Sequence, residues 1–210
     1  MNVLLVNGSP HANGCTYTAL EEVAKTLNTE GIETQIFQVG TKPLAGCIAC
    51  ESCAKTGRCV FSDCVNDFRD LAKDADGFVF GSPVHYASAG GAITSFMDRA
   101  FFSDMLAGRQ SFYLKPAAAI VSARRAGTTA TFDQLNKYFT ISEMPVISSR
   151  YWNMVHGFTP EDVKKDLEGL QTMRVLARNM AWFLKCKEAG IKAGVKFPER
   201  EETILTNFIR

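Results

Sequence analysis

The feature of this sequence that most constrains its fold is a set of short apolar runs that do not alternate with polar residues. They are VLLV at 3–6, GFVFG at 77–81 and AAAIVSA at 117–123. Such runs are typical of strands that helices cover on both faces of a parallel sheet. Segments with apolar residues at helical spacing follow the runs, so strands and helices are expected to alternate along the chain.

This reading predicts a single α/β domain over residues 1–210. The order of elements indicates a parallel sheet wrapped by helices. Two segments depart from the pattern: a cysteine-rich loop at 45–64 and a C-terminal extension at 190–210, which is expected to cover the core or pack on a neighbouring subunit. The expected strands are 2–7, 33–39, 77–81, 117–123 and 145–148, and the expected helices are 16–28, 66–73, 92–102, 129–141 and 160–186.

The composition argues against several classes of partner. Hydrophobic residues make up 46% and charged residues 21% of the chain, and the net charge is +1. Such a balance gives no strong field for nucleic acid or a membrane surface. The sequence has no apolar run long enough to span a bilayer and no leader-like start, so a cytoplasmic location is expected. Cysteines stay reduced there, and a dense group of them points to metal or redox chemistry.

Three loops of unusual composition follow expected strands, where ligands bind in an open parallel sheet. In the first, GSPHANGCT at 8–16, hydroxyls, free backbone N–H groups and the next helix N-terminus suit a single phosphate. It lacks the lysine and spacing of a Walker A motif and lacks G-x-G-x-x-G. An ordinary capped helix preceded by a polar loop is the alternative.

The second and third loops carry aromatic and basic side chains. SPVHYASAGG at 82–91 offers an apolar and aromatic surface for a planar heterocycle, although core packing or a subunit contact would also explain Tyr86 and His85. SARRAGTT at 122–129 offers Arg124 or Arg125 to a phosphate of the ligand or of a pyridine nucleotide. A solvated charge pair is the alternative for these arginines.

Four segments together resemble the flavodoxin-like NAD(P)H-dependent FMN reductases. NGSPHANGCT is similar to their NGSPR-x-x-GNT loop, GSPVHYASAGGAITSFMDRA to their GSPVYYG…LKAFIDR segment, and VSARRAGTTATFDQLNKYF to their SAGGRHGGQETTLLQL segment. LEGLQTMRVLARNMAWFLK resembles a C-terminal helix of the branch called iron–sulfur flavoproteins. The resemblance implies a five-stranded flavodoxin-like sheet of order 2-1-3-4-5 that binds FMN, with relatives forming dimers or tetramers.

The resemblance also implies which residues contact the cofactor. The first loop would hold the FMN phosphate, the second would border the isoalloxazine, and the third would complete the site. His11 and Cys15 stand where the family has Arg and Asn, which weakens the expected phosphate contacts, and His85 and Arg124–Arg125 also depart from the common pattern. The expected FMN contacts are Ser9, His11, Asn13, Gly14, Cys15, Thr16, Pro83, Val84, His85, Tyr86, Ser122, Ala123, Arg124 and Gly127.

The cysteine-rich loop contains the spacing C-x2-C-x2-C-x5-C, formed by Cys47, Cys50, Cys53 and Cys59. Short spacers in a loop allow thiolates to converge on a metal centre. The pattern resembles the compact motif that ligates a [4Fe–4S] cluster in iron–sulfur flavoproteins. A tetrahedral zinc site, a reducible disulfide pair and a loop without metal are the alternatives, and Cys64 could replace Cys59. Cys15 and Cys186 are expected to be unligated, with Cys186 on the buried side of its helix.

The expected activity is an FMN-dependent oxidoreductase that passes electrons from NAD(P)H to a small acceptor such as a quinone, azo compound, metal ion or flavin. Hydride transfer of this kind needs no acid–base side chain, and none is nominated. The alternative is electron exchange with ferredoxin through a [4Fe–4S] cluster on the four cysteines. A non-enzymatic flavin- or metal-binding module is the third possibility. A homodimer or homotetramer is expected.

Overall fold

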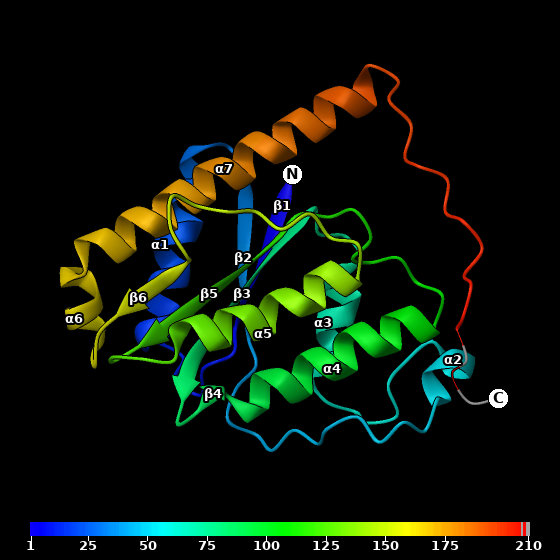
Figure 1. Ribbon diagram of the computed structural model, residues 1–210, viewed down its shortest axis with the longest axis horizontal. Coiled ribbons are helices and arrows are strands. Elements are labelled where there is room, and N and C mark those ends of the chain that lie inside the picture. The colour runs from blue at the N-terminus through cyan, green and yellow to red at the C-terminus, as the bar shows by residue number, and fades with distance from the viewer. Residues whose placement is uncertain (207, 209–210) are drawn as a thin grey trace.

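A central parallel sheet organises the molecule into three layers (Figure 1). The computed structural model describes residues 1–206 and 208. The sheet has the order β2-β1-β3-β5-β6, which is the predicted flavodoxin-like order when the short β4 is set aside. The pairing is parallel throughout, except that β4 (Ser88–Ala89) forms an antiparallel hairpin on the end of β3. The parallel strands are β1 (Asn2–Asn7), β2 (Glu33–Gln38), β3 (Gly77–His85), β5 (Ala117–Ala123) and β6 (Met154–His156).

Helices cover both faces of the sheet. One face carries α1 (Cys15–Thr29), α6 (Pro160–Lys165) and α7 (Leu167–Lys192). The opposite face carries α3 (Cys64–Ala72), α4 (Gly91–Leu106) and α5 (Thr128–Ile141). A single turn, α2 (Ser52–Thr56), lies within the cysteine-rich loop. None of the helices in the described part of the chain combines the length and apolarity needed to cross a lipid bilayer.

The two cores follow from the alternation of side chains along each strand. Phe78 and Phe80 point into the core under α3, α4 and α5, whereas Val79 between them points into the core under α1 and α7. All three side chains are fully buried. Burying each contributes about 1.5–3 kcal/mol to folding. Uniformly apolar strands were the correct basis for predicting a sheet covered on both faces.

The fifth strand lies later in the chain than predicted. In the expected strand 145–148, Val146 makes only an isolated bridge to Ala117, and the parallel strand is Met154–His156. The reason is that polar side chains in the segment between them bond to other parts of the molecule. Ser149 Oγ donates to the carbonyl of Thr172, and Asn153 Nδ2 donates to the carbonyl of Ala119. The first bond ties the segment to α7 and the second ties it to β5, before the chain forms β6.

The expected helix at 160–186 is two helices that meet at Asp166. This residue ends α6, and its carboxylate accepts hydrogen bonds from the Gly169 and His156 amides at 2.9 and 2.7 Å. A carboxylate that caps a new helix start breaks the continuous pattern of helical bonds. The helix also continues beyond its predicted end, through Lys192.

Two further expectations at the C-terminal end change. Cys186 is exposed, not buried, because α7 packs through a different stripe that includes Met180 and Leu184. After α7 the chain runs as an extended tail across the molecule towards α2 (Figure 1). Arg200 in this tail pairs with Glu143, and its guanidinium lies 4.4 Å from the centre of the Tyr113 ring.

Candidate functional site

The three loops that follow β1, β3 and β5 meet at one edge of the sheet. The Gly8 amide donates to the Gly81 carbonyl at 2.9 Å, which joins the first loop to β3. The hydroxyls of Thr16 and Ser122 are 2.8 Å apart, which joins the first and third loops. The second and third loops also touch, since a Cβ on Gly127 would lie only 2.8 Å from Val84 Cγ1. We call these three loops, 8–16, 82–91 and 122–129, the loop rim.

Two side chains that sequence reasoning missed, the buried Asn7 and the half-buried Gln38, shape the first loop. Asn7 Oδ1 accepts from the Ser9 amide at 3.1 Å, and its Nδ2 donates to Gln38 Oε1 and the His11 carbonyl. Gln38 Nε2 donates to the Ser9 carbonyl at 2.7 Å. The sequence signal that could have indicated this role is that each of two neighbouring strands ends in a polar residue. These bonds hold the loop in one conformation before any ligand binds.

The N-terminus of α1 opens onto this loop without a side-chain cap. Gly14 is the N-cap residue, and no side chain in the described part of the chain accepts from the first-turn amides. The first turn also contains no acidic residue that would compensate the positive end of the helix dipole. Unpaired helix N–H groups are a ready site for a phosphate. Together with the buried hydroxyl of Thr16, this end of α1 fits the phosphate of FMN.

The residues expected in the first loop differ in their exposure. Ser9 and Thr16 are buried, His11 and Asn13 are exposed, and Cys15 is half-buried. The Ser9 hydroxyl accepts from the His11 amide at 3.1 Å. Cys15 Sγ lies 3.7 Å from the Gly157 carbonyl, and burial raises the pKa of its thiol. A neutral Cys15 adds no negative charge that would repel a phosphate.

The second loop presents Tyr86 at the tip of the β3–β4 hairpin. Tyr86 has φ 61°, and its side chain is fully exposed. A left-handed conformation costs a residue other than glycine about 1–2 kcal/mol, and such strain gathers at functional sites. His85 is also exposed, whereas Pro83 and Val84 are half-buried. The hairpin therefore offers an uncovered aromatic ring beside the other two loops.

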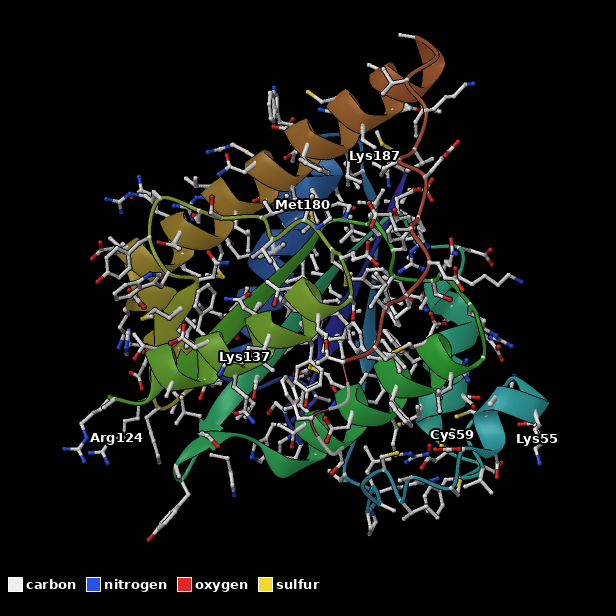
Figure 2. The ribbon with its side chains drawn as sticks, turned by 45° about the vertical axis from the view of Figure 1, so that its right-hand side comes forward. Lys55, Cys59, Arg124, Lys137, Met180 and Lys187 are labelled. Atoms are coloured by element: carbon white, nitrogen blue, oxygen red, sulfur yellow. The ribbon has the colours of Figure 1, made fainter. Side chains whose placement is uncertain are left out.

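The third loop begins with buried residues and continues with exposed arginines. Ser122 and Ala123 are buried at the end of β5, and Gly127 with φ 93° begins α5. Arg124 projects from the molecule (Figure 2), and its guanidinium lies 5.9 Å from the centre of the Phe158 ring. Arg124 is thus free to meet a negatively charged group that approaches the rim from solvent.

The four expected metal-ligating cysteines line one small cavity within the cysteine-rich loop. Cys47 and Cys50 are exposed, Cys53 is buried and Cys59 is half-buried. Ala49 and Glu51, on either side of Cys50, have φ of 51° and 54°. No set of three His, Cys, Asp or Glu residues in the described part of the chain has the geometry of a single-ion site.

A [4Fe–4S] cluster makes a different demand, because each thiolate binds a separate iron and the four sulfurs stand farther apart than around one ion. Convergence of all four thiols on one cavity fits that donor set. Cys64 does not line this cavity; its Sγ lies 3.7 Å from the Val39 carbonyl. The structure therefore groups Cys59, and not Cys64, with the other three.

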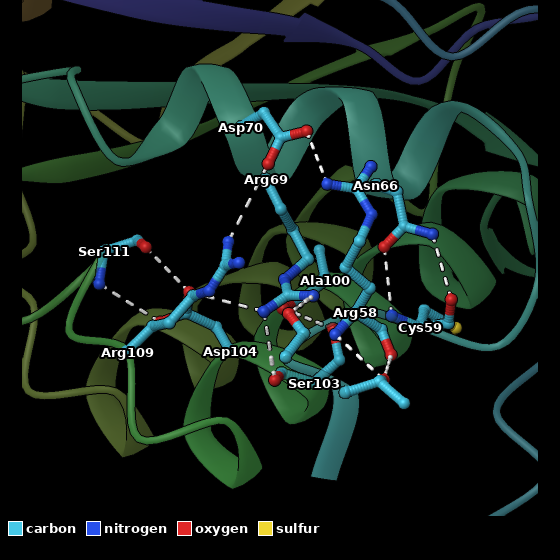
Figure 3. Close-up of polar contacts among 12 residues, drawn as sticks. Arg58, Cys59, Asn66, Arg69, Asp70, Ala100, Ser103, Asp104, Arg109 and Ser111 are labelled. Atoms are coloured by element: carbon cyan, nitrogen blue, oxygen red, sulfur yellow. Dashed lines mark hydrogen bonds and ion pairs between the residues drawn. The ribbon is translucent and has the colours of Figure 1, made fainter. Parts of the chain in front are cut away.

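Polar side chains of α3 hold the end of the cysteine-rich loop (Figure 3). Asn66 accepts from the Cys59 amide and donates to the carbonyls of Cys59 and Phe61, at 2.9–3.0 Å. Arg69 is buried and donates to the carbonyls of Gly57 and Ser103. The sequence offered only polar residues in a short helix, so these roles could not be read from it.

Arg99 of α4 is a second buried arginine that sequence reasoning missed. Its Nε and one terminal nitrogen each lie 3.3 Å from Cys59 Sγ, and it pairs with both oxygens of Asp63 at 2.7 and 2.9 Å. Although burial acts against the charge, the hydrogen bonds to Asp63 and Cys59 raise the pKa of Arg99. A permanent positive charge therefore lies against the cysteine cavity.

A larger cavity of about 760 Å³ lies beside the cysteines, between α4, α5 and the C-terminal tail. Cys47, Phe102, Tyr113 and Tyr138 contribute to its wall, and Arg200 of the tail borders it. Aromatic walls with a few polar groups are typical of sites for small planar molecules.

Comparisons with known proteins identify the sequence and structural relatives of this chain. Residues 1–159 match the family model described as NADPH-dependent FMN reductase. An iron–sulfur flavoprotein of Methanocaldococcus jannaschii is 32% identical over 88% of this chain and 98% of its own length. An iron–sulfur flavoprotein of Archaeoglobus fulgidus is 27% identical over 87% of this chain and 97% of its own.

Solved structures support the fold. RosB with a bound 8-demethyl-8-formylriboflavin-5'-phosphate intermediate superposes with a TM-score of 0.69 at 14% identity, covering 100% of this chain and 94% of its own. An archaeal flavodoxin superposes with a TM-score of 0.59 at 17% identity, covering 88% of this chain and 99% of its own. The chain therefore belongs to the NADPH-dependent FMN reductase family and is an FMN-dependent oxidoreductase related to iron–sulfur flavoproteins.

Proposed function

We propose that the loop rim is the FMN site of this oxidoreductase. The first loop and the α1 N-terminus bind the phosphate, and the Thr16 hydroxyl contributes a further hydrogen bond. The backbone of 83–86 and of 122–127 borders the isoalloxazine, with the Tyr86 ring at the outer edge. The observation that carries the proposal is the uncapped α1 N-terminus, which opens beside a Thr16–Ser122 hydrogen bond that joins two of the loops.

The reaction is electron transfer from NAD(P)H to a small acceptor such as a quinone, azo compound, metal ion or flavin. When bound, FMN would supply the hydride and electron chemistry of this reaction. The protein positions the ring and its partners, and no side chain needs to move a proton in the hydride step. Arg124 is exposed at the rim and suits a phosphate of the pyridine nucleotide.

Anaerobic titration with NADPH tests this proposal. Protein reconstituted with FMN should lose its flavin absorbance when NADPH is added and regain it with a quinone. NADH in a parallel titration reports the nucleotide preference. No FMN binding would contradict the proposed site, and binding without bleaching by either nucleotide would contradict the proposed donor.

A second function is favoured by the four thiols that share one cavity. Cys47, Cys50, Cys53 and Cys59 would hold a [4Fe–4S] cluster and exchange single electrons with ferredoxin. The cluster would supply one-electron chemistry beside the two-electron chemistry of the flavin. The names of the two archaeal relatives support this assignment.

Iron and sulfide analysis of anaerobically purified protein tests the cluster. Cys50→Ser should remove most of the iron, whereas Cys186→Ser, at an exposed position on α7, should not. Equal iron in both variants, or none in the unaltered protein, would contradict the assignment. Zinc in place of iron and sulfide would support the tetrahedral alternative.

A cytoplasmic location and a homodimer or homotetramer remain predictions. Exposed Trp152 and Phe158 follow β5 in the chain, and Phe158 lies near Arg124 of the rim, as a subunit contact beside the flavin would require. Light scattering of the FMN-loaded protein measures the oligomeric state, and a monomer would contradict the prediction.

A further inference from the structure

Arg99 uses every donor of its guanidinium within the cysteine-rich loop. The side chain is fully buried, and each of the five N–H groups of its guanidinium donates a hydrogen bond. Two point to Cys59 Sγ, two to the carboxylate of Asp63, and one to the carbonyl of Ala45 at 3.3 Å. The guanidinium also lies 4.7 Å from the centre of the Phe61 ring. This side chain is therefore fixed in position.

The partners of Arg99 lie at both ends of the cysteine segment, which we define as residues 45–63. Ala45 precedes Cys47, while Cys59 and Asp63 close the segment. Arg99 itself belongs to α4, which is anchored in the core by Phe96, Met97 and Ala100. One side chain on a rigid helix thus ties together the entry and the exit of the segment that carries all four thiols.

We propose that Arg99 is a positioning residue that clamps the cysteine segment and sets the reduction potential of the iron–sulfur centre through the sulfur of Cys59. The inference rests on the proposed [4Fe–4S] site. Reduction adds one electron to the centre, supplied by dithionite in the test below, and breaks no bond to Cys59. The two N–H groups stabilise the additional negative charge that reduction places on the sulfur. Arg99 therefore favours the reduced state.

Arg69 shows by contrast what is particular to Arg99. Both arginines are buried and both donate to carbonyls next to the cysteines, Arg69 to Gly57 and Arg99 to Ala45. Among the described residues, Arg69 makes no hydrogen bond to a sulfur. The two residues share a structural role on the same segment, and of these two Arg99 is the one whose described contacts include a direct bond to an expected metal ligand.

Arg99→Lys tests the potential, with Arg69→Lys as the matched control. Lysine keeps the positive charge near Asp63 but cannot reproduce the planar fork that reaches Cys59 and Asp63 together. In anaerobic redox titration we expect R99K to shift the one-electron equilibrium about tenfold towards the oxidised centre, which is about 59 mV. R69K should shift it much less. Equal shifts in both variants would overturn the role of the sulfur contact.

Asp63→Asn provides a test in the opposite direction and does not depend on the folding of R99K. Asparagine remains an equally good N-cap for α3, whose Val65 amide bonds Asp63. Removing the carboxylate leaves the full charge of Arg99 facing the sulfur, so D63N should raise the potential. An unchanged or lowered potential in D63N would overturn the proposal.

Hydrogen exchange of the full-length protein without added iron tests the clamp separately. R99K should speed amide exchange across residues 45–63 relative to the unaltered protein, while β1 and β3 stay protected. No change in exchange would overturn the clamp. If the unaltered protein bound FMN but no iron and sulfide, the cluster proposal and the role of the sulfur would fall together, and the exchange result would still decide the clamp.

Discussion

The loop rim and the cysteine segment are held in place by different means. The rim is built from strand ends: its loops are short, and their contacts involve backbone amides, strand-end side chains such as Asn7 and Gln38, and a Thr–Ser pair. The cysteine segment begins after β2 and contains only one helical turn. The segment is held against α3 and α4 by side chains of these helices, namely Asn66, Arg69 and Arg99.

This difference predicts different responses to substitution. Many individually weak contacts stabilise the loop rim. Losing one of them should therefore reduce ligand affinity more than folding stability. The cysteine segment is held in place by a few buried side chains. Losing one charged group among them should therefore lower the folding stability and loosen the whole segment.

The largest expected effect comes from removing the charge of Arg99. Arg99→Met leaves Asp63 and Cys59 without their partner beside an apolar side chain, and we expect a loss of about 3 kcal/mol in the free energy of unfolding. Urea denaturation measures it. Arg58→Met is the control, since the Arg58–Asp70 pair is about half exposed and should cost less than about 1 kcal/mol. Similar losses in both variants would show that the buried Arg99–Asp63 pair contributes no more to stability than the exposed pair does.

A smaller effect is expected where β3 packs tightly against α1, directly before the second loop of the rim. A Cβ on Gly81 would lie 2.8 Å from Thr16 Cγ2 and 3.0 Å from Leu20 Cδ1. Gly81→Ala should therefore push α1 away from β3, at a cost of about 1–3 kcal/mol, and weaken FMN binding by displacing Thr16. Thermal unfolding and FMN titration measure the two effects. Gly46→Ala, outside the loop rim and with open space around its Cβ, should change neither, and an equal loss there would contradict the packing argument.

Thr16→Val separates affinity from folding at the rim. It removes the hydroxyl that bonds Ser122 and that we assign to the FMN phosphate. We expect the Kd for FMN to rise about tenfold, which is about 1.4 kcal/mol. Quenching of FMN fluorescence measures it. Thr26→Val is the control, because the Thr26 hydroxyl bonds the Glu22 carbonyl within α1. An unchanged Kd for T16V would place the phosphate elsewhere.

The smallest effect concerns alkaline pH and the outer contact between α4 and α5. Burial, and then the hydrogen bond to Asp98, raise the pKa of Tyr138 above its ordinary value of 10. Above pH 10 the unfolded chain loses this proton while the folded chain keeps it. Folding stability should therefore fall as the pH rises through 10 towards the raised pKa. Tyr138→Phe should make this fall shallower in urea titrations at pH 9–11, and an identical slope would contradict it.

Some parts of the fold could be predicted because their signals are local. Apolar runs marked β1, β3 and β5, and loops of unusual composition after them marked the rim. The fifth strand was misplaced because Asn153 and Ser149 bond distant carbonyls, which no local pattern reveals. The break at Asp166 was missed for a similar reason, since its carboxylate serves both Gly169 and the distant His156.

The candidate site divides in the same way. Which loops contain hydroxyl, glycine and aromatic residues, and that four thiols lie close along one segment, could be seen in the sequence alone, because composition and spacing are local properties. The folded structure was needed to show that Thr16 meets Ser122, that Cys59 and not Cys64 joins the other thiols, and that Arg99 bonds the Cys59 sulfur. These contacts depend on how α4 and α1 pack against the sheet, and packing is settled by the burial of whole helix faces rather than by any one residue.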